Sequence, residues 1–245
     1  MASAESTTFF THTWSVYDLI TEHNYMYHRE IHARIADLLK RRKDQNQYQL
    51  LDLGCGNARF LAPCLMQSPP ARYEGVDLSE AALEEARSYL AELRCPVVLT
   101  HGDLLEAAES TDNQWDVIFT GFALHHLTPE EKARFFQAAG RCLTDSGWLL
   151  MVDVVRDENQ SREDYMEDYL RLMREHWTQI PPDQLETACE HVEAYDYPEC
   201  LSTLKKMAKA SGLNSSLVIS RYGHHYSVLF SRHVLPLEMS LSAYE

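Results

Sequence analysis

The chain has 245 residues, of which 45% are hydrophobic and 24% are charged, enough to fill the core of one large α/β domain or two small ones. Its 22 Lys and Arg residues against 37 Asp and Glu residues give a formal net charge of -15. This charge argues against a nucleic-acid partner, because phosphate backbones require a basic face. The 6 scattered cysteines contain no CxxC pair, which argues against a zinc site and a disulfide framework.

The N-terminal segment 1–45 is predicted to form helices. Its stretch FFTHTWSVYDLITEHNYMYH leads into a helix expected over 28–42, because apolar residues recur there at helical spacing, namely Ile31, Ile35, Leu38 and Leu39. The first ten residues lack the basic and apolar regions of a secretory signal, and no apolar run approaches the ~20 residues of a membrane helix. We therefore expect a soluble, cytoplasmic protein without stable membrane insertion.

Strands and helices alternate from residue 46 to residue 155, as in βα units with a parallel sheet. Helices are expected over 58–66 and 79–93, and another opens at TPEE, where Thr128, Pro129 and Glu131 form a capping-box pattern. The continuously apolar run GWLLMVDVV predicts a strand covered on both faces. Apolar runs predict five strands in this core segment, over 47–53, 72–76, 97–100, 115–120 and 147–155.

The pattern changes after Val155, where helices replace the alternation. Helices are predicted in SREDYMEDYLRLMREHW, after Pro181-Pro182 and from Cys200 to Ala210, so that 156–212 form a helical insertion. The chain then returns to strands at SLVIS and YSVLFS. The short connection RYGHH allows only an antiparallel hairpin, expected over 213–233. Residues 234–245 show no period and are predicted to be a tail.

The stretch QLLDLGCGNARF ends a predicted strand with a glycine loop of the kind that binds nucleotides. Asp52 lies two residues before Gly54, where it would repel a diphosphate and attract a cation. S-adenosylmethionine carries a sulfonium and an ammonium group and no phosphate. Asp77 and Asp103 follow the next two strands, and the carboxyl ends of parallel strands share one edge of a sheet. They suit ribose hydroxyls and an adenine amine, although Asp52 can also serve as a simple turn cap and Asp77 as a simple helix cap.

Five motifs, LLDLGCGNARF, YEGVDLSE, HGDLLE, WDVIFTGFALHHL and LTDSGWLLMVDVV, resemble in order and spacing those of the class I S-adenosylmethionine-dependent methyltransferases. The resemblance covers residues 47–232, with Ala58 where a third glycine is commoner. It implies one structural domain of the α/β class, a Rossmann-like doubly wound sheet of seven strands with the last strand antiparallel, and S-adenosylmethionine as cofactor. It also implies that segment 1–45 folds over the cofactor as a lid and that the insertion 156–212 covers a small-molecule substrate. It implies that Asp77 binds the ribose of the cofactor and that Leu78, Asp103 and Leu104 surround the adenine. The residues that it places around the methionine moiety are Asp52, Gly54, Cys55, Gly56 and Thr120.

Candidate catalytic residues follow the fourth predicted strand. His125 or His126 can take a proton near neutral pH, although in similar proteins such a ring is often only a wall. Tyr27 is a further catalytic candidate, and Arg29 can pair with the carboxylate of the cofactor. Substrate contacts are expected from residues that can equally be plain core, namely Tyr17, Tyr25, His28, Tyr165, Tyr169 and His225. Methyl transfer needs no metal, and none is expected.

Several functions remain open at this stage. The leading interpretation is methyl transfer to a nitrogen, oxygen or sulfur atom of a small metabolite, by a monomer or homodimer. A lipid or quinone methyltransferase would require an apolar channel, and a non-catalytic regulatory protein that binds S-adenosylmethionine would share the same acids. A nicotinamide oxidoreductase is disfavoured by Asp52 and by the antiparallel end of the sheet.

Overall fold

The central sheet determines where ligands can bind. A computed structural model describes residues 14–42, 44 and 47–234, and eight strands in these ranges form one sheet in the order β3-β2-β1-β4-β5-β8-β7, with β6 paired to β5. Neighbours from β3 to β5 run parallel, whereas β8 runs antiparallel to both β5 and β7, which confirms the predicted α/β class and reversed last strand. The strands are β1 (Gln49–Leu53), β2 (Arg72–Asp77), β3 (Val97–His101), β4 (Trp115–Gly121), β5 (Leu143–Arg156), β6 (Glu199–Cys200), β7 (Ser215–Tyr222) and β8 (His225–Ser231).

The helices begin where the sequence supplies caps. Thr128 and Glu131 form the predicted capping box, with Pro129 in the first turn. The helix after β1 begins at Leu61, three residues later than predicted, because Ala58 takes a left-handed conformation with φ of 56°. The helices are α2 (Trp14–Glu22), α3 (His28–Lys40), α4 (Leu61–Gln67), α5 (Glu80–Tyr89), α6 (Leu104–Ser110), α7 (Pro129–Cys142), α8 (Arg162–His176), α9 (Pro182–Tyr195) and α10 (Leu201–Ala210), with a 3-10 turn η1 (Leu124–His126).

Two short elements were not predicted from the sequence. Helix α6 has only two turns, and its N-cap is Asp103, which the sequence analysis assigned to a ligand alone. Strand β6 has two residues, too few to leave an alternation in the sequence. Both elements lie at the carboxyl end of the sheet, which is where parallel sheets usually bind ligands.

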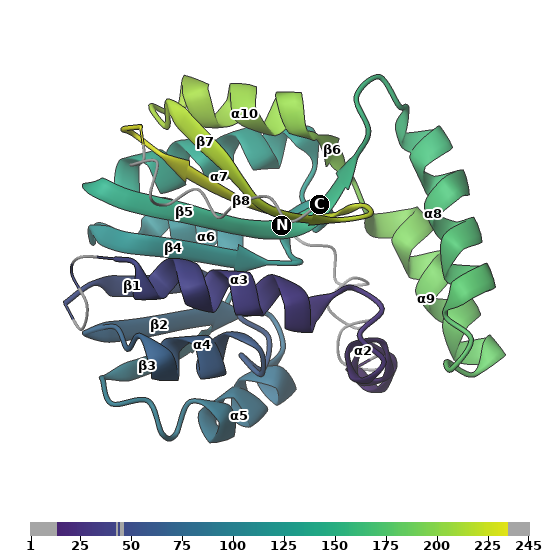
Figure 1. Ribbon diagram of the computed structural model, residues 1–245, viewed down its shortest axis with the longest axis horizontal. Helices are drawn as coiled ribbons and strands as arrows, with labels where there is room; N and C mark the ends of the chain where they lie inside the picture. The colour runs from purple at the N-terminus through teal and green to yellow at the C-terminus, as the bar shows by residue number, and fades with distance from the viewer. Residues whose placement is uncertain (1–13, 43, 45–46, 235–245) are drawn as a thin grey trace.

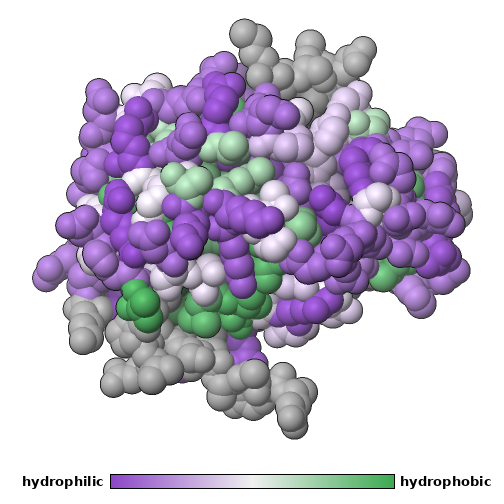
Figure 2. Space-filling view, turned by 90° about the horizontal axis from the view of Figure 1, so that it is seen from above, coloured by the Kyte–Doolittle hydropathy of each residue, from purple (hydrophilic) through white to green (hydrophobic). Residues whose placement is uncertain are grey.

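Helices cover both faces of the sheet (Figure 1). One hydrophobic cluster joins α3, α4 and α5 to one face, and a second cluster joins α6, α7 and α10 to the other. Burial on both faces explains why residues 148–155 of β5 are apolar except for Asp153. Most of the surface shown in Figure 2 is hydrophilic, with smaller hydrophobic areas between the polar residues.

A third hydrophobic cluster lies outside the two sheet layers. It joins α2 to α8 and α9, with Val16 and Ile20 on one side and Tyr165, Tyr169 and Met173 on the other. Figure 1 shows α2, α8 and α9 together beyond one end of the strands. The predicted lid and insertion therefore contact each other, and the sheet end lies beneath them.

Residues 1–13, 43, 45–46 and 235–245, which include parts of the predicted lid and tail, lie outside the described residues. No helix in the described part of the chain combines the length and the low polarity that crossing a bilayer requires.

Candidate active site

A cavity of about 610 Å³ lies between the carboxyl end of the sheet and the helices α2, α8 and α9. This volume is within the range of pockets that hold small ligands. Its walls come from the loops after β1, β2, β3 and β4 and from the segment that follows α9. Of the residues predicted for the site, ten line it: Tyr17, Gly54, Gly56, Asp77, Leu78, Asp103, Leu104, His125, His126 and Tyr169.

The glycine loop after β1 is held against the end of β2. The amides of Gly54 and Cys55 both donate to the carbonyl of Val76, at 2.9 and 3.0 Å. Gly54 has a φ of 76°, and a side chain there would bring its Cβ to 2.6 Å from the Cβ of Ala123. A residue with a side chain at position 54 would therefore be strained and would fill this part of the cavity wall.

Asp77 at the end of β2 organises the loop and faces the cavity. Its Oδ2 accepts from the amide of Gly56, and its Oδ1 accepts from the amide of Ser79, both at 2.8 Å. Burial raises the pKa of Asp77, while these bonds favour its charged form. A carboxylate offers about four lone-pair sites, so two remain for the hydroxyls of a ribose.

Asp103, which follows β3, caps a helix and also lines the cavity. Its Oδ1 accepts from the amides of Leu105 and Glu106, at 2.8 and 3.0 Å, which makes it the N-cap of α6. Both bonds use Oδ1, and the residue lines the cavity beside Leu104. The Oδ2 atom can therefore accept from a ligand amine without loss of the cap.

Asp52 does not line the cavity, although the sequence analysis placed it beside the methionine moiety. Its side chain is buried, with 1% exposed, and its Oδ2 accepts from the hydroxyl of Tyr73 at 2.7 Å. Its Oδ1 has no hydrogen-bond partner among the residues that the structure describes, and burial raises the pKa of Asp52 to about 7. Cys55 and Thr120 are likewise buried behind the wall. A direct contact of these three residues with a ligand stays a prediction.

The lid residues lie in two places. Tyr17 lines the cavity. Its pKa is raised mainly by burial and further by the nearby charge of Asp77. His28 packs in the layer behind, with its ring 4.5 Å from that of Phe60. Arg29 is exposed and donates to the carbonyl of Glu22 at 2.8 Å. In this structure the guanidinium of Arg29 holds the end of α2 and does not reach the cavity.

The other aromatic candidates join the lid to the insertion. Tyr25 stacks on Trp177 at 5.3 Å, and its hydroxyl accepts from the amide of Gln179. Tyr27 stacks on Tyr222 at 5.3 Å and is 41% exposed, away from the cavity wall. These contacts give both tyrosines a structural role, and a catalytic role of Tyr27 stays a prediction.

Tyr169 brings the insertion to the cavity. Its hydroxyl lies 3.1 Å from the Nε2 of His225 on β8, whose pKa burial lowers to about 4. Tyr165 stacks on Tyr169 and is buried. Of these three substrate candidates, only Tyr169 lines the cavity.

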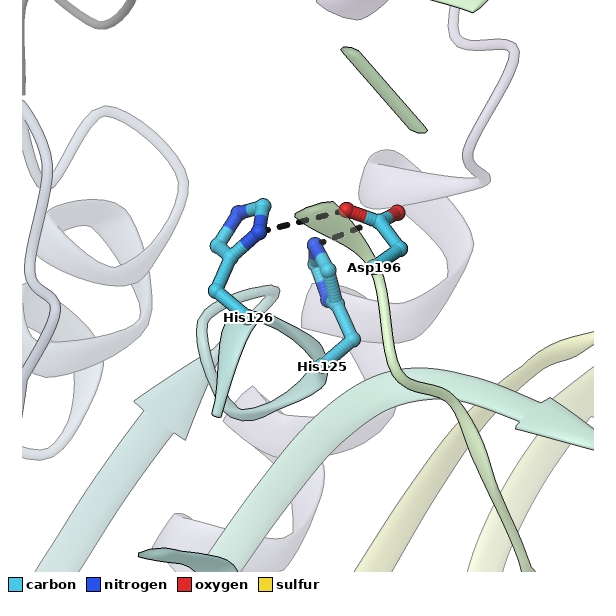
Figure 3. Close-up of side chains that lie close together, drawn as sticks. All are labelled: His125, His126 and Asp196. Atoms are coloured by element: carbon cyan, nitrogen blue, oxygen red, sulfur yellow. Dashed lines mark ion pairs between the residues drawn. The ribbon is translucent and has the colours of Figure 1, made fainter. Parts of the chain in front are cut away.

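Two histidines and two aspartates form an ionic cluster at the far end of the cavity. His125 Nδ1 lies 2.5 Å from Asp153 Oδ1, and the His125 amide donates to the second oxygen of Asp153 at 3.0 Å. The opposite ring atom, Nε2, lies 3.7 Å from Asp196 Oδ2. Asp196 also lies 3.2 Å from His126 Nδ1, and Figure 3 shows both rings turned toward this carboxylate.

The two histidines differ in charge. Burial opposes charge on His125, but the carboxylates of Asp196 and Asp153 overcome it and raise the pKa of His125 to about 9. Burial and the charge of His125 lower the pKa of His126, whose side chain is 22% exposed toward the cavity. At neutral pH, His125 is therefore an imidazolium, and His126 is a neutral ring that can accept a proton.

A buried lysine holds the two halves of this cluster together. The Nζ of Lys132 on α7 donates to the carbonyl of Leu127, next to the histidines, and to the carbonyl of Tyr197 at 2.5 Å. The Tyr197 amide donates to the carbonyl of His125 at 2.6 Å. Burial lowers the pKa of Lys132 to about 8. The backbone beside Asp196 is therefore tied directly to the backbone of the histidine pair.

Sequence reasoning missed Asp153, Asp196 and Lys132. Asp153 left a signal, because it is the only charged residue in the apolar run WLLMVDVV. A charge inside a strand buried on both faces requires a partner. Asp196 and Lys132 lie in polar surroundings in the sequence, which gives no indication that they are buried.

Comparisons with known proteins place this chain among similar folds. Residues 50–147 match the family model described as "Methyltransferase domain". An uncharacterized methyltransferase of Staphylococcus carnosus (strain TM300) is 32% identical over 107 residues, 44% of this chain and 46% of that protein. The chain thus spans less than half the length of this curated relative.

Two solved structures are similar in fold. The YcgJ protein of Bacillus subtilis has a TM-score of 0.55 at 21% identity, over 77% of this chain and 71% of that chain. The mitomycin 7-O-methyltransferase MmcR has a TM-score of 0.56 at 18% identity, over 91% of this chain and 61% of that chain.

Proposed function

We propose that this chain, which contains a methyltransferase domain over residues 50–147, binds S-adenosylmethionine and transfers its methyl group to a small metabolite. The domain match and the fold of the similar structures confirm the resemblance to class I methyltransferases. The proposed function rests on one continuous cavity of about 610 Å³. It joins the acids at the ends of β2 and β3 to the histidine cluster under the insertion.

The cofactor end of the cavity suits an adenosine ligand without phosphate. Asp77 has two lone-pair sites left for ribose hydroxyls, and Asp103 has an oxygen left for an adenine amine. Gly54 leaves room beside Ala123 that a side chain would fill. The acids at this end favour a ligand with positive charge over a diphosphate.

The acceptor end has an aromatic and apolar wall. Tyr169, Met173 and Trp177 face it from α8 and the turn that follows, and Val192 and Tyr195 face it from α9. Among the described residues that line the cavity, none is Lys or Arg, whereas Asp77, Asp103, Glu131 and Asp196 are acidic. This balance favours a neutral or cationic acceptor with an aromatic or apolar body.

The chain supplies position and a proton acceptor. When bound, S-adenosylmethionine supplies a methyl group that its positively charged sulfur activates. The walls from α2, α8 and α9 exclude water and orient the acceptor. Such orientation accounts for much of the rate acceleration of a bimolecular reaction. His126 is neutral and faces the cavity, so it takes the proton of an acceptor hydroxyl, thiol or ammonium group.

A lipid or quinone acceptor is the second candidate. The lid side of the cavity is apolar, with Val16, Ile20 and Met26 in its wall. Such a wall suits a hydrocarbon or isoprenoid chain. A screen of acceptors with isotope-labelled cofactor distinguishes the two candidates when it includes a lipid extract beside a pool of polar metabolites.

Binding and transfer are measured separately. Calorimetry is expected to show binding of S-adenosylhomocysteine that Asp77→Ala weakens at least about 100-fold, from two charge-assisted hydrogen bonds of about 1.5 kcal/mol each. Glu74→Ala, an acid of the same strand outside the cavity wall, is the matched control with unchanged affinity. Unchanged binding in Asp77→Ala would show that the ribose assignment is wrong.

Transfer is followed with isotope-labelled cofactor and cellular metabolite pools. We expect one compound to acquire the label, and we expect His126→Ala to lower turnover far more than cofactor affinity. If the cofactor binds and no pool is labelled, the non-catalytic regulatory alternative replaces this proposal.

A further inference from the structure

Three donor atoms converge at the acceptor end of the cavity from two segments about 70 residues apart. The Nε2 of His125 and the Nδ1 of His126 lie 3.7 and 3.2 Å from the carboxylate of Asp196. One ligand atom from each residue lies within 4.8 Å of the others. The first separation is measured to Oδ2 of Asp196 and the second to Oδ1, so the two distances involve both oxygens of the carboxylate. Donors about 2.1 Å from a tetrahedral ion are about 3.4 Å apart, which is close to both separations.

The orientation of His125 is the second observation. Its Nδ1 faces Asp153 at 2.5 Å, so a proton on Nδ1 points there and Nε2 points toward Asp196. An ion bound at Nε2 would replace the second proton of the imidazolium. The oxygens of Asp153 are further occupied by the amides of His125 and Val154. A carboxylate that holds the far nitrogen of a histidine is the usual outer partner of a metal ligand.

The backbone around the donors is held in place before any ion binds. Lys132 joins the carbonyls of Leu127 and Tyr197, and the Tyr197 amide donates to His125. The segment that carries Asp196 therefore cannot move away from the histidine pair without breaking buried hydrogen bonds. Figure 3 shows the three side chains meeting above the loop that follows β4.

We propose that His125, His126 and Asp196 bind one divalent transition-metal ion, of the zinc, cobalt or iron(II) class, at the wall of the cavity. Two imidazoles and one carboxylate suit these ions, whereas magnesium and calcium prefer oxygen ligands alone. Three protein ligands leave coordination positions open, as in catalytic sites and unlike closed structural sites. All three residues line the cavity, so an acceptor oxygen or sulfur can take an open position.

The inference reaches beyond the proposed function, because a metal can be bound whether or not a methyl group is transferred. An ion bound to His126 would occupy the lone pair that otherwise accepts a proton, and the ion itself would act as a Lewis acid that favours the deprotonated acceptor. An acceptor with a hydroxyl or thiol group is then favoured over an amine, since a charged oxygen or sulfur binds such an ion strongly.

The test titrates the full chain, first stripped with a chelator, with Co²⁺ and with Zn²⁺. We expect one ion per chain, the visible absorption of Co²⁺ with mixed nitrogen and oxygen ligands, and Zn²⁺ binding by calorimetry. His126→Ala and Asp196→Asn are expected to weaken Zn²⁺ binding at least about 100-fold. Asp153→Asn, which changes only the outer partner, is expected to weaken it about 10- to 100-fold.

The matched control is His191→Ala. His191 lines the same cavity, and its ring lies 5.6 Å from that of His126, but it is outside the group of three donors. Its removal is expected to leave Zn²⁺ affinity within about 3-fold. Binding of S-adenosylhomocysteine by each variant verifies that it is folded and tests the cofactor assignment separately. Zn²⁺ binding that is absent in the wild type, or equal in the wild type, His126→Ala and Asp196→Asn, would overturn the proposal and leave the cluster as an ion-pair network.

Discussion

Asp52→Asn is expected to change the pH dependence of stability in a way that can be worked out from the structure. Burial raises the pKa of Asp52 from 3.8 to about 7 in the folded chain. The folded state therefore holds the proton more tightly than the unfolded state, so the unfolding free energy falls as the pH rises from about 4 to about 7. The two pH units between about pH 5 and the folded pKa correspond to about 2.7 kcal/mol, at about 1.36 kcal/mol each.

Asparagine removes this titration and little else. Its amide oxygen can still accept from the hydroxyl of Tyr73, and its amide nitrogen takes the place of Oδ1, which has no hydrogen-bond partner. Burying that nitrogen costs about 1–3 kcal/mol at every pH. Relative to the wild type, the variant should therefore gain about 2.7 kcal/mol between about pH 5 and about pH 8.

Urea unfolding of both proteins at the two pH values measures this change. Every other titrating group is present in both chains, so the difference between them isolates Asp52. A difference that stays constant within about 0.5 kcal/mol would refute the raised pKa and the buried position that causes it.

The same variant tests whether Asp52 acts on the cofactor through its charge. S-adenosylmethionine carries a positive sulfur that S-adenosylhomocysteine lacks. At about pH 8, where Asp52 is ionised, the substitution should weaken binding of S-adenosylmethionine more than that of S-adenosylhomocysteine. Equal losses would mean that Asp52 only supports the glycine loop.

Two further substitutions test the framework of the site. Lys132→Met should lower the unfolding free energy by about 2–4 kcal/mol, because it leaves the buried carbonyls of Leu127 and Tyr197 without their donor. Urea unfolding measures this change, and a decrease in unfolding free energy below about 0.5 kcal/mol would contradict the proposed role of Lys132 in joining the two segments. Gly54→Ala should weaken S-adenosylhomocysteine binding at least about 10-fold, because its Cβ would lie 2.6 Å from that of Ala123 at a φ of 76°. Calorimetry measures this, and wild-type affinity would show that the loop relaxes freely.

The order of strands and helices could be predicted from the sequence alone, except for the short elements α6 and β6. Apolar runs, the Thr128 capping box and the short RYGHH connection are local signals, and each corresponds to the element observed. Asp77 and Asp103 could be placed for the same reason. An acid directly after a parallel strand lies at the carboxyl edge whatever else the fold does.

The direction and the partners of single side chains were decided only by the tertiary structure. Asp52 lies inside a strand, so the pleat points it toward Tyr73 and away from the cavity. The predicted lid residues Arg29 and Tyr27 are directed elsewhere by contacts with Glu22 and Tyr222.

The histidine cluster shows the physical reason most directly. LHHL is visible in the sequence, but its chemistry depends on Asp153, 28 positions from His125, and on Asp196, which the insertion carries. The charge of a buried histidine ring depends on the carboxylates within a few ångströms of it. The sequence positions of these residues do not show which segments will lie together in the fold. Local spacing therefore determined the fold and the cofactor edge, and long-range packing decided which groups can move a proton or bind an ion.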